Sequence, residues 1–334
     1  MSNIKSKIKQ TNINSSFVAP TKKKGYAYIT VDKRFLNLGD RLNFTLYSKN
    51  LPSQMSLFLQ SDTVLDKDKK QKLEEIENIY VSVTEKSRYE YFIEENLQNI
   101  LKNETLTMDE KTEVIYTSST ELTHSLYNNP NALENANRSE KIVTPIMESI
   151  IYNEDTISSY MKIIEYDYYT HTHSLNVSVY TLCLGAALNL KKDLLTSLGR
   201  AALLHDLGKS QIDKDIVNKD GKLTQEEFET MKNHPALGHE IAIHIGIDDQ
   251  RILDGIRHHH EKLDGMGYPD KIKGDDITLF PRIIGICDVF DALTTRRTYK
   301  DAMKTFDALH IMRTEMNTHL DMKILGAFIK MLHK

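Results

Sequence analysis

The 334-residue sequence contains little cysteine, proline or glycine, with only 2 Cys, 7 Pro and 14 Gly. Two cysteines, Cys183 and Cys287, are too few for a disulfide framework, so we expect the protein to reside in a reducing cytosol. The few prolines and the lack of self-similarity at a period of about 20–50 residues argue against a repeat protein. The composition as a whole favours an ordered, soluble and helix-rich protein.

The sequence also lacks long apolar runs and any excess of positive charge. No stretch approaches the roughly 18 apolar residues of a membrane span, and the start, MSNIKSKIKQTNINSS, has no apolar core of a secretory signal. A net charge of −4 and a pI of about 6.4 give no support for binding DNA or RNA polymers, which favours basic domains. We therefore expect a cytoplasmic protein with no membrane span and no polymeric nucleic acid as a partner.

The first third of the chain predicts a small α+β unit. Residues 1–24 are polar and end in three lysines, which is typical of a flexible tail. Strands are expected at four short β-branched or aromatic runs, 26–31, 43–48, 56–60 and 79–83. Helices are expected near 66–77 and over 86–103. Because residues 25–104 carry no motif linked to chemistry, we expect this unit to serve regulation or assembly.

From residue 105 the pattern becomes almost entirely helical. Thr107 and Glu110 have the spacing of a capping box, which predicts a helix start. The pair Asn129-Pro130 predicts the end of that helix. We expect a helical linker over 105–150 that leads into a helical domain over 151–334, so that the fold is mainly α.

Histidine is distributed unevenly along the chain. Nine of the 13 histidines lie between His171 and His260, and histidine is the commonest metal ligand. In AALLHDLGK (201–209), the pair His205-Asp206 lies among apolar residues, and Lys209 follows about one helical turn later. Burial of Asp206 is costly unless a cation compensates its charge, and a divalent metal would do so. For this segment taken alone, a solvated helix end stays an equal alternative.

A second group of histidines lies in ILDGIRHHHEKLDGMGYP (252–269). At about 100° per helical residue, His259 and His260 share the apolar face of a helix, whereas His258 lies nearly opposite. Two adjacent imidazoles in an apolar setting need partners for their ring nitrogens. The pattern therefore predicts metal ligation by His259 and His260, and a solvated or supporting role for His258.

Three further residues complete a set that suits two metals. His173 begins an apolar helical segment, His234 follows a predicted helix, and Asp288 lies in the apolar stretch RIIGICDVFDAL. Alone, His173 would more often be a structural residue. Seven ligands are too many for one catalytic metal with open positions, so we expect two metals bridged by Asp206. Mixed nitrogen and oxygen ligands suit Fe, Mn, Ni, Co or Zn better than Ca or Mg. The predicted ligands are His173, His205, Asp206, His234, His259, His260 and Asp288.

Together these segments resemble the HD-GYP family, the extended branch of the HD phosphohydrolases. The resemblance covers about residues 150–310 and rests on YYTHTHS (168–174), HDLGK (205–209), HP (234–235), HHEKLDGMGYP (259–269) and RIIGICDVFDALTTRRTYK (282–300). It implies a helical fold with two or three metals, often iron or manganese. It also implies hydrolysis of cyclic di-GMP to pGpG, and in some members onward to GMP.

The resemblance assigns roles to individual residues. It implies metal ligation at the same seven positions and phosphate contacts for Lys209, Arg297 and Lys300. Without it, Arg297 and Lys300 would be read as part of a solvated charged face. Some members hold a third metal through a Glu one turn before the first His, and Tyr169 at that position favours two metals here. Asp206 would bridge the metals and orient a hydroxide between them, while Lys209 would hold a phosphate oxygen.

Three functions remain open at this stage. The favoured one is a cyclic di-GMP phosphodiesterase with two divalent transition metals, Fe or Mn before Zn, Ni or Co. The second is an HD-type phosphohydrolase that acts on another nucleotide, such as (p)ppGpp or cyclic GMP-AMP. The third is a receptor that binds the dinucleotide, or a diguanylate cyclase through the GYP loop, without turnover. The oligomeric state is also open, with a homodimer among the options.

Overall fold

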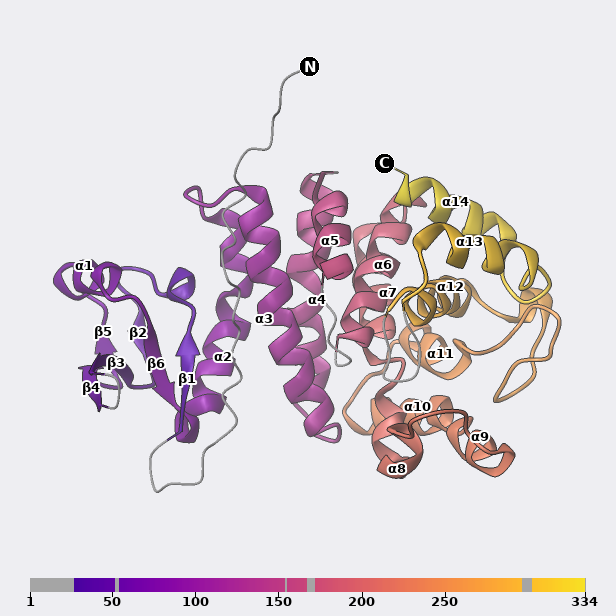
Figure 1. Ribbon diagram of the computed structural model, residues 1–334, viewed down its shortest axis with the longest axis horizontal. Coiled ribbons are helices and arrows are strands. Elements are labelled where there is room, and N and C mark those ends of the chain that lie inside the picture. Colours follow the sequence, from indigo (N-terminus) through magenta and orange to yellow (C-terminus); the bar gives the residue numbers. More distant parts are fainter. Residues whose placement is uncertain (1–26, 52–53, 154, 167–171, 296–301, 334) are drawn as a thin grey trace, which may run out of the picture. The chain divides into compact units, whose positions relative to one another are not determined.

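The computed structural model describes residues 27–51, 54–153, 155–166, 172–295 and 302–333 (Figure 1). Three residues named above, Tyr169, Arg297 and Lys300, lie outside this described part. The chain divides into two compact units, Met1–Tyr89 and Glu90–Lys334, and each is described by itself. Within the described residues, no helix combines the length and the apolar character that a bilayer span requires.

The first unit is built on an antiparallel sheet with the strand order β1-β6-β3-β4, whose strands are labelled in Figure 1. Its strands are β1 (Tyr28–Val31), β3 (Leu46–Leu51), β4 (Gln54–Leu59) and β6 (Ile79–Ser82). All four expected strands are therefore confirmed, and α1 (Lys67–Glu75) confirms the helix expected near 66–77. The structure adds a ladder of two-residue strands, β2 (Arg41–Leu42) and β5 (Thr63–Val64), which are too short to show an alternating pattern.

The core of this unit consists of apolar side chains from both the sheet and its connections. In β6, Ile79 and Val81 are fully buried while Tyr80 between them is half-buried, as expected for a strand with one face on a core. Phe35 and Phe44 are also fully buried. Helix α2 (Lys86–Asn96), which begins in this unit and continues into the second, and the 3-10 helix η3 (Leu97–Lys102) of the second unit occupy the stretch expected to be helical over 86–103.

The second unit is helical, which confirms the mainly α prediction. Its helices in chain order are α3 (Met108–Asn128), α4 (Asn135–Tyr152), α5 (Asp155–Tyr166), α6 (His173–Ala187), α7 (Lys192–Leu204), α8 (Lys214–Val217), α9 (Gln225–Met231), α10 (His234–His244), α11 (Gln250–His258), α12 (Leu279–Thr294), α13 (Thr305–Thr314) and α14 (Met322–Leu332). Helix α6 is buried along nearly its whole length and packs against α7 and α12. It is the centre around which this unit is assembled (Figure 1).

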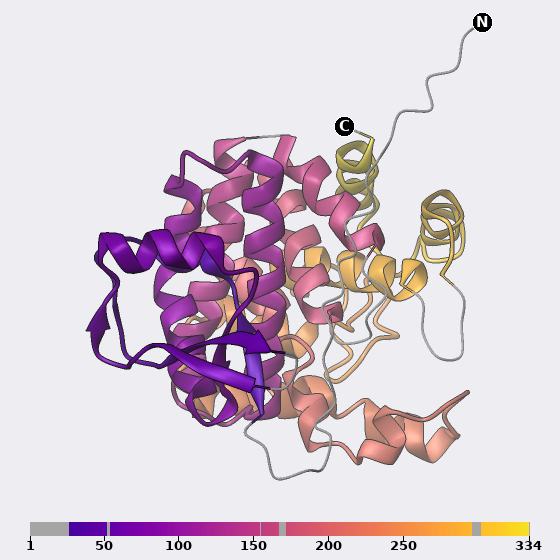
Figure 2. The ribbon, with the colours of Figure 1, turned by 60° about the vertical axis from the view of Figure 1, so that its left-hand side comes forward.

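Helix starts in this unit follow the local sequence signals. The Thr107 side chain accepts from the Glu110 backbone N–H, and the Glu110 side chain accepts from the Thr107 backbone N–H. This capping box confirms the predicted start of α3, and α3 ends at Asn128, directly before Asn129-Pro130. An equivalent capping box of Thr224 and Glu227 begins α9. The segment from α8 to α10 lies at one end of the helical unit in both views (Figures 1 and 2).

Candidate metal centre

The ligands predicted from the sequence come from five separate helices of the second unit. Two residues begin α6 and α10, four directly follow α7 and α11, and one lies inside α12. In that order they are His173, His234, His205, Asp206, His259, His260 and Asp288. The packing of α6 against α7 and α12, and of α10 against α11, brings these side chains into one cluster.

The first part of the cluster contains two imidazoles and two carboxylates. His173 Nε2 lies 3.1 Å from Asp288 Oδ1 and 3.5 Å from Asp206 Oδ2. His205 Nε2 lies 3.4 Å from the same Asp206 oxygen. His205 is fully buried and Asp206 is 5% exposed. These four side chains can therefore present nitrogen and oxygen atoms to a common centre.

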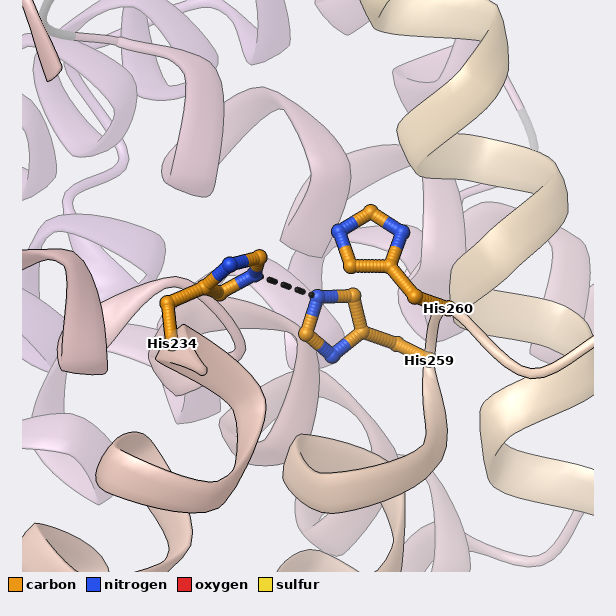
Figure 3. A group of neighbouring side chains, drawn as sticks. All are labelled: His234, His259 and His260. Carbon is orange, nitrogen blue, oxygen red and sulfur yellow. Dashed lines mark hydrogen bonds between the residues drawn. The ribbon is translucent and has the colours of Figure 1, made fainter. Parts of the chain in front are cut away.

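The second part of the cluster consists of three imidazoles (Figure 3). His234 begins α10, and His259 and His260 follow α11. The rings of His259 and His260 have centroids 4.2 Å apart, and those of His234 and His260 are 5.0 Å apart. His234 Nε2 and His259 Nε2 face each other at 3.2 Å (Figure 3).

Asp206 lies between the two parts of the cluster. Its Oδ2 faces His173 and His205, whereas its Oδ1 lies 3.3 Å from His234 Nε2. Lys209 Nζ donates to Asp206 Oδ2 at 2.6 Å. One carboxylate therefore offers one oxygen to each group of imidazoles, which is the geometry of a bridging ligand.

Backbone carbonyls fix the orientation of three of the imidazoles. In each case Nδ1 donates to the carbonyl three residues earlier, at the end of the preceding turn. The pairs are His205 with Ala202 (2.7 Å), His234 with Met231 (2.8 Å) and His259 with Ile256 (2.7 Å). Since Nδ1 carries the hydrogen in this arrangement, Nε2 presents its lone pair to the cluster, as a metal-ligating histidine requires.

The donor atoms fit divalent metals. With Nδ1 of both His234 and His259 bound to carbonyls, their Nε2 atoms have no hydrogen to share, so two lone pairs meet at 3.2 Å. Two nitrogens that each lie about 2.1 Å from one metal are separated by roughly 3.0–3.4 Å at octahedral or tetrahedral angles. A cation held by both nitrogens would account for this contact. Among the described residues, the buried atoms His205 Nε2 and Asp206 Oδ1 also have no hydrogen-bond partner.

The protonation states suit metal binding at most positions. Burial lowers the pKa of His234 to about 4 and that of His260 to about 3, so both imidazoles are neutral. Burial opposes ionisation of Asp206, but Lys209 and the neighbouring imidazoles hold its pKa well below the usual value. Burial also disfavours the charged form of His173, yet its hydrogen bonds with Asp288 and Asp291 raise its pKa to about 10. Neutral imidazoles and ionised carboxylates are the forms that bind metals.

Asp291 is a residue that the sequence patterns did not single out. Its Oδ2 accepts from His173 Nδ1 at 2.6 Å, and the residue is fully buried. It follows Asp288 by one turn of α12, so both carboxylates face α6. The sequence feature that could have revealed Asp291 is the presence of a second aspartate in the apolar stretch RIIGICDVFDAL. Carboxylates in this position orient the histidine ring and raise its basicity as a ligand.

The helices end earlier than the patterns suggested. The His205-Asp206 pair was expected on a helix with Lys209, but α7 ends at Leu204 and Lys209 lies in the 3-10 helix η4 (Leu207–Gln211). Likewise α11 ends at His258, so His259 and His260 follow the helix rather than belong to it. A turn follows each helix, so the turn rather than helical periodicity places these adjacent side chains at the centre.

His258 points away from the cluster, as its position on the helical wheel suggested. Its Nδ1 lies 2.5 Å from Asp254 and its Nε2 lies 2.8 Å from Asp270. Asp270 also binds Arg257 through two hydrogen bonds. His258 therefore ties α11 to the loop after it, and its ring nitrogens are engaged outside the metal centre.

Two glycines permit close backbone contacts beneath the ligands. A Cβ on Gly208 would lie 2.0 Å from the carbonyl oxygen of His234 and 2.4 Å from the backbone nitrogen of Gly238. A Cβ on Gly285 would lie 2.9 Å from the carbonyl oxygen of His259. The loop that contains Asp206 and helix α10, which begins with His234, are thus held together through a contact that only glycine allows.

A cavity of about 250 Å³ adjoins the cluster. Four of its lining residues, Lys209, His234, His260 and Tyr268, belong to the centre or lie beside it. The Tyr268 ring is 4.8 Å from the ring of His260, centroid to centroid. The remaining lining residues come from the segment between η4 and α10, namely Ile216, Val217, Lys219, Gly221, Leu223 and Met231.

This centre and fold identify the class of the protein. The family model for the HD domain matches residues 146–324, which is more than half of the chain. The chain therefore belongs to the HD domain family, and its relatives and its GYP segment assign it to the HD-GYP branch. Membership in this family implies that the centre binds divalent metal, in agreement with the donor atoms described above.

Curated relatives share about half of the chain. A cyclic di-GMP phosphodiesterase of Pseudomonas aeruginosa is 35% identical over 188 residues, covering 56% of this chain and 45% of that protein. A 3'3'-cGAMP-specific phosphodiesterase of Vibrio cholerae is 37% identical over 183 residues, covering 54% and 40%. A cyclic di-GMP phosphodiesterase response regulator of Xanthomonas campestris is 34% identical over 180 residues, covering 53% and 47%. The chain thus spans less than half of each relative's own length.

One solved structure resembles most of the chain in fold. It is a protein of Bdellovibrio bacteriovorus described as an HDG"Y"P protein, with a TM-score of 0.65. The match covers 92% of this chain and all of that chain, at 18% sequence identity. At this identity the match establishes a common fold.

Replacement of Gly208 tests the backbone contact between the loop that contains Asp206 and helix α10. Gly208→Ala should lower the free energy of unfolding by about 1–3 kcal/mol, because the added methyl group cannot fit against the His234 carbonyl. It should also weaken metal binding, since His234 must shift. The control is Gly326→Ala in α14, where a Cβ meets nothing within 4 Å. Urea unfolding with metal titration measures both effects, and two variants of equal stability and affinity would contradict the account.

Asp291→Asn tests the support of His173. The amide keeps the size of the side chain but loses its charge, so metal affinity should fall by about 10–100-fold. Asp307→Asn, an exposed position in α13, is the matched control and should leave the affinity unchanged. Competition with a chromogenic chelator gives the affinities. An Asp291→Asn protein that binds metal as tightly as the unmodified chain would show that this carboxylate does not support a ligand.

Proposed function

We propose that the chain hydrolyses a phosphodiester bond of cyclic di-GMP to give linear pGpG, with a second cleavage that gives GMP. The observation that carries the proposal is the Asp206 carboxylate, which faces two groups of imidazoles next to a cavity. The Pseudomonas and Xanthomonas relatives support the substrate, because both are named cyclic di-GMP phosphodiesterases.

The seven predicted ligands would hold two divalent transition metals, which we propose to be iron or manganese, with Zn, Ni and Co as alternatives. When bound, such metals supply Lewis acidity toward phosphate oxygens and lower the pKa of water at the centre. The chain contributes the geometry. Three Nδ1–carbonyl hydrogen bonds and the Asp291 carboxylate hold the imidazole rings in place. The positions at which the metals would present positive charge to a phosphate are therefore set before substrate binds.

Two side chains in the cavity wall are suited to the phosphate. Lys209 donates one N–H to Asp206, and its ammonium has two more donors for a non-bridging phosphate oxygen. Burial raises the pKa of Tyr268, and the charges of Asp288 and Asp206 raise it further. The Tyr268 hydroxyl therefore keeps its proton and can donate to an anionic substrate. The proposed phosphate contacts of Arg297 and Lys300 lie outside the described residues and stay predictions.

A hybrid dinucleotide is the second candidate substrate. The Vibrio relative at 37% identity is named as specific for 3'3'-cGAMP, so relatives of this chain are named for two different cyclic dinucleotides. Both substrates have the same two phosphodiesters, and the metal centre alone does not separate them. Binding without turnover is the third reading, and the full set of seven ligand positions favours catalysis over it.

For the other parts of the chain we propose broader roles. We propose that residues 25–104 form a regulatory or assembly module behind a tail over 1–24, and that 105–150 link it to the catalytic domain over 151–334. Met266 in the GYP loop is 75% exposed, which supports contact with a partner such as a diguanylate cyclase. A cytoplasmic location and a homodimer stay predictions.

A substrate panel tests the proposed function. The full chain is purified without oxygen, loaded with Fe(II) or Mn(II), and incubated with cyclic di-GMP, 3'3'-cGAMP and cyclic di-AMP. Chromatography should show pGpG as the first product, formed fastest from cyclic di-GMP. Faster cleavage of 3'3'-cGAMP would favour the hybrid substrate. Tight binding of cyclic di-GMP without any linear product would establish a receptor instead.

Substitutions at Asp206 and Lys209 should separate metal binding from substrate handling. Asp206→Asn should abolish turnover and lower the metal content, because it removes the bridging charge. Lys209→Ala should retain both metals yet reduce turnover by about 10²–10³-fold, a typical effect of losing one charge-stabilising donor. Lys214→Ala, an exposed lysine in α8, serves as the control. Metal loss in Lys209→Ala, or full activity in Asp206→Asn, would contradict the assigned roles.

A further inference from the structure

The cavity beside the metal centre has two chemically different ends. Lys209, His260 and Tyr268 line the end next to the centre. The other end is formed by α8, the segment that leads into α9 and the last residue of α9, where Ile216, Leu223 and Met231 are among the apolar lining residues. If a phosphate occupies the first end, the nucleoside attached to it points toward the second.

The size of the cavity suits part of a cyclic dinucleotide. Its volume of about 250 Å³ is below the roughly 300–1,000 Å³ that pockets for drug-sized ligands provide. One nucleotide half can therefore enter while the other half stays outside. Apolar side chains suit the faces of a purine ring, whereas the edge of the ring carries hydrogen-bonding groups that need polar partners.

Lys219 is the charged residue among the lining residues at the apolar end. Its Nζ donates to both carboxylate oxygens of Glu227, at 2.7 and 2.6 Å. Glu227 is itself fixed, because its Oε2 accepts from the Thr224 backbone N–H at 2.7 Å in the capping box of α9. The Lys219 ammonium is thus held in place by a helix start rather than extended freely into solvent.

The ammonium group retains one donor for a ligand. A lysine has three N–H donors and no acceptor, and Glu227 engages two of the three. The Lys219 side chain is 32% exposed and the residue lines the cavity, so a ligand in the cavity can offer an acceptor to the remaining donor. An acceptor-rich edge of a base would satisfy it, whereas an amino group would place a donor against a donor.

We propose that Lys219 reads the guanine base of the nucleotide half that enters the cavity. This inference rests on the proposed function and deepens it by naming a residue that determines specificity. Guanine presents N7 and O6, both acceptors, on one edge, and adenine has an amino donor in place of O6. A lysine fixed at that edge therefore favours guanine over adenine. It also favours hypoxanthine, which keeps N7 and O6 and lacks only the 2-amino group.

Mononucleotides test this base preference without any need for turnover. Calorimetry on the full chain compares GMP, IMP and AMP, which are the size of the proposed half-substrate and contain no diester bond. The unmodified protein should bind GMP and IMP more tightly than AMP. Lys219→Met should weaken GMP and IMP binding by about 10–100-fold, as for a lost hydrogen bond to a charged group, and change AMP binding less than about 2-fold.

Three further variants serve as matched controls. Lys219→Arg keeps donors for N7 and O6 and should retain the guanine preference. Glu227→Gln keeps a side-chain acceptor for the helix cap but removes the charge that holds Lys219, so the preference should shrink. Lys222→Met, an exposed lysine in the same loop, should change nothing. Equal losses of GMP, IMP and AMP in Lys219→Met would show a phosphate contact and overturn the proposal, as would equal binding of GMP and AMP by the unmodified protein.

Turnover distinguishes this inference from the proposed function. With cyclic di-GMP, Lys219→Met should lower kcat/KM by at least about 10-fold, while any cleavage of cyclic di-AMP stays within about 2-fold. If the unmodified protein cleaves no cyclic dinucleotide but its GMP preference requires Lys219, the proposed function fails and the base contact stands. If it cleaves cyclic di-GMP and Lys219→Met does so equally well, the base contact fails and the function stands.

Discussion

The structure of the second unit depends on one buried carboxylate with two differently engaged oxygens. Asp206 is 5% exposed, and its oxygens face imidazoles from α6, α7 and α10. A buried carboxylate of this kind is costly unless positive charge compensates it. Lys209 provides one such charge at 2.6 Å. Burial lowers the pKa of His234 and of His260, so these two imidazoles are neutral, and divalent cations are the compensation that fits their lone pairs.

Most of the seven predicted ligands lie at helix ends, where the backbone sets the direction of their side chains. At the end of α7, of α11 and of the segment before α10, a backbone carbonyl three residues earlier binds the histidine Nδ1. The free carbonyls of a final helical turn are available for this purpose. Close contacts at Gly208 and Gly285 then bring these helix ends within reach of one another. The packing of the helices and the arrangement of the predicted ligands therefore depend on the same contacts.

The sequence was sufficient to predict most of the elements and the residues that gather in the cluster, but not their detailed geometry. Residue types and spacing predicted the capping boxes at Thr107 and Thr224, the four main strands and the cluster of ligand residues. Periodicity failed at the helix ends, because a helical wheel assumes that α11 continues through His260. The sequence did not reveal the contact of Asp291 with His173 or that of Lys219 with Glu227, because these partners are distant in sequence or lie across a loop, where no local pattern shows them.

Anomalous diffraction from crystals of the iron- or manganese-loaded protein tests the central claim most directly. Data collected on both sides of the metal absorption edge locate each ion independently of the protein model. The account predicts two peaks that share Asp206, one bound by His173, His205 and Asp288 and the other by His234, His259 and His260. A single peak, or two peaks that do not both contact the Asp206 carboxylate, would contradict it.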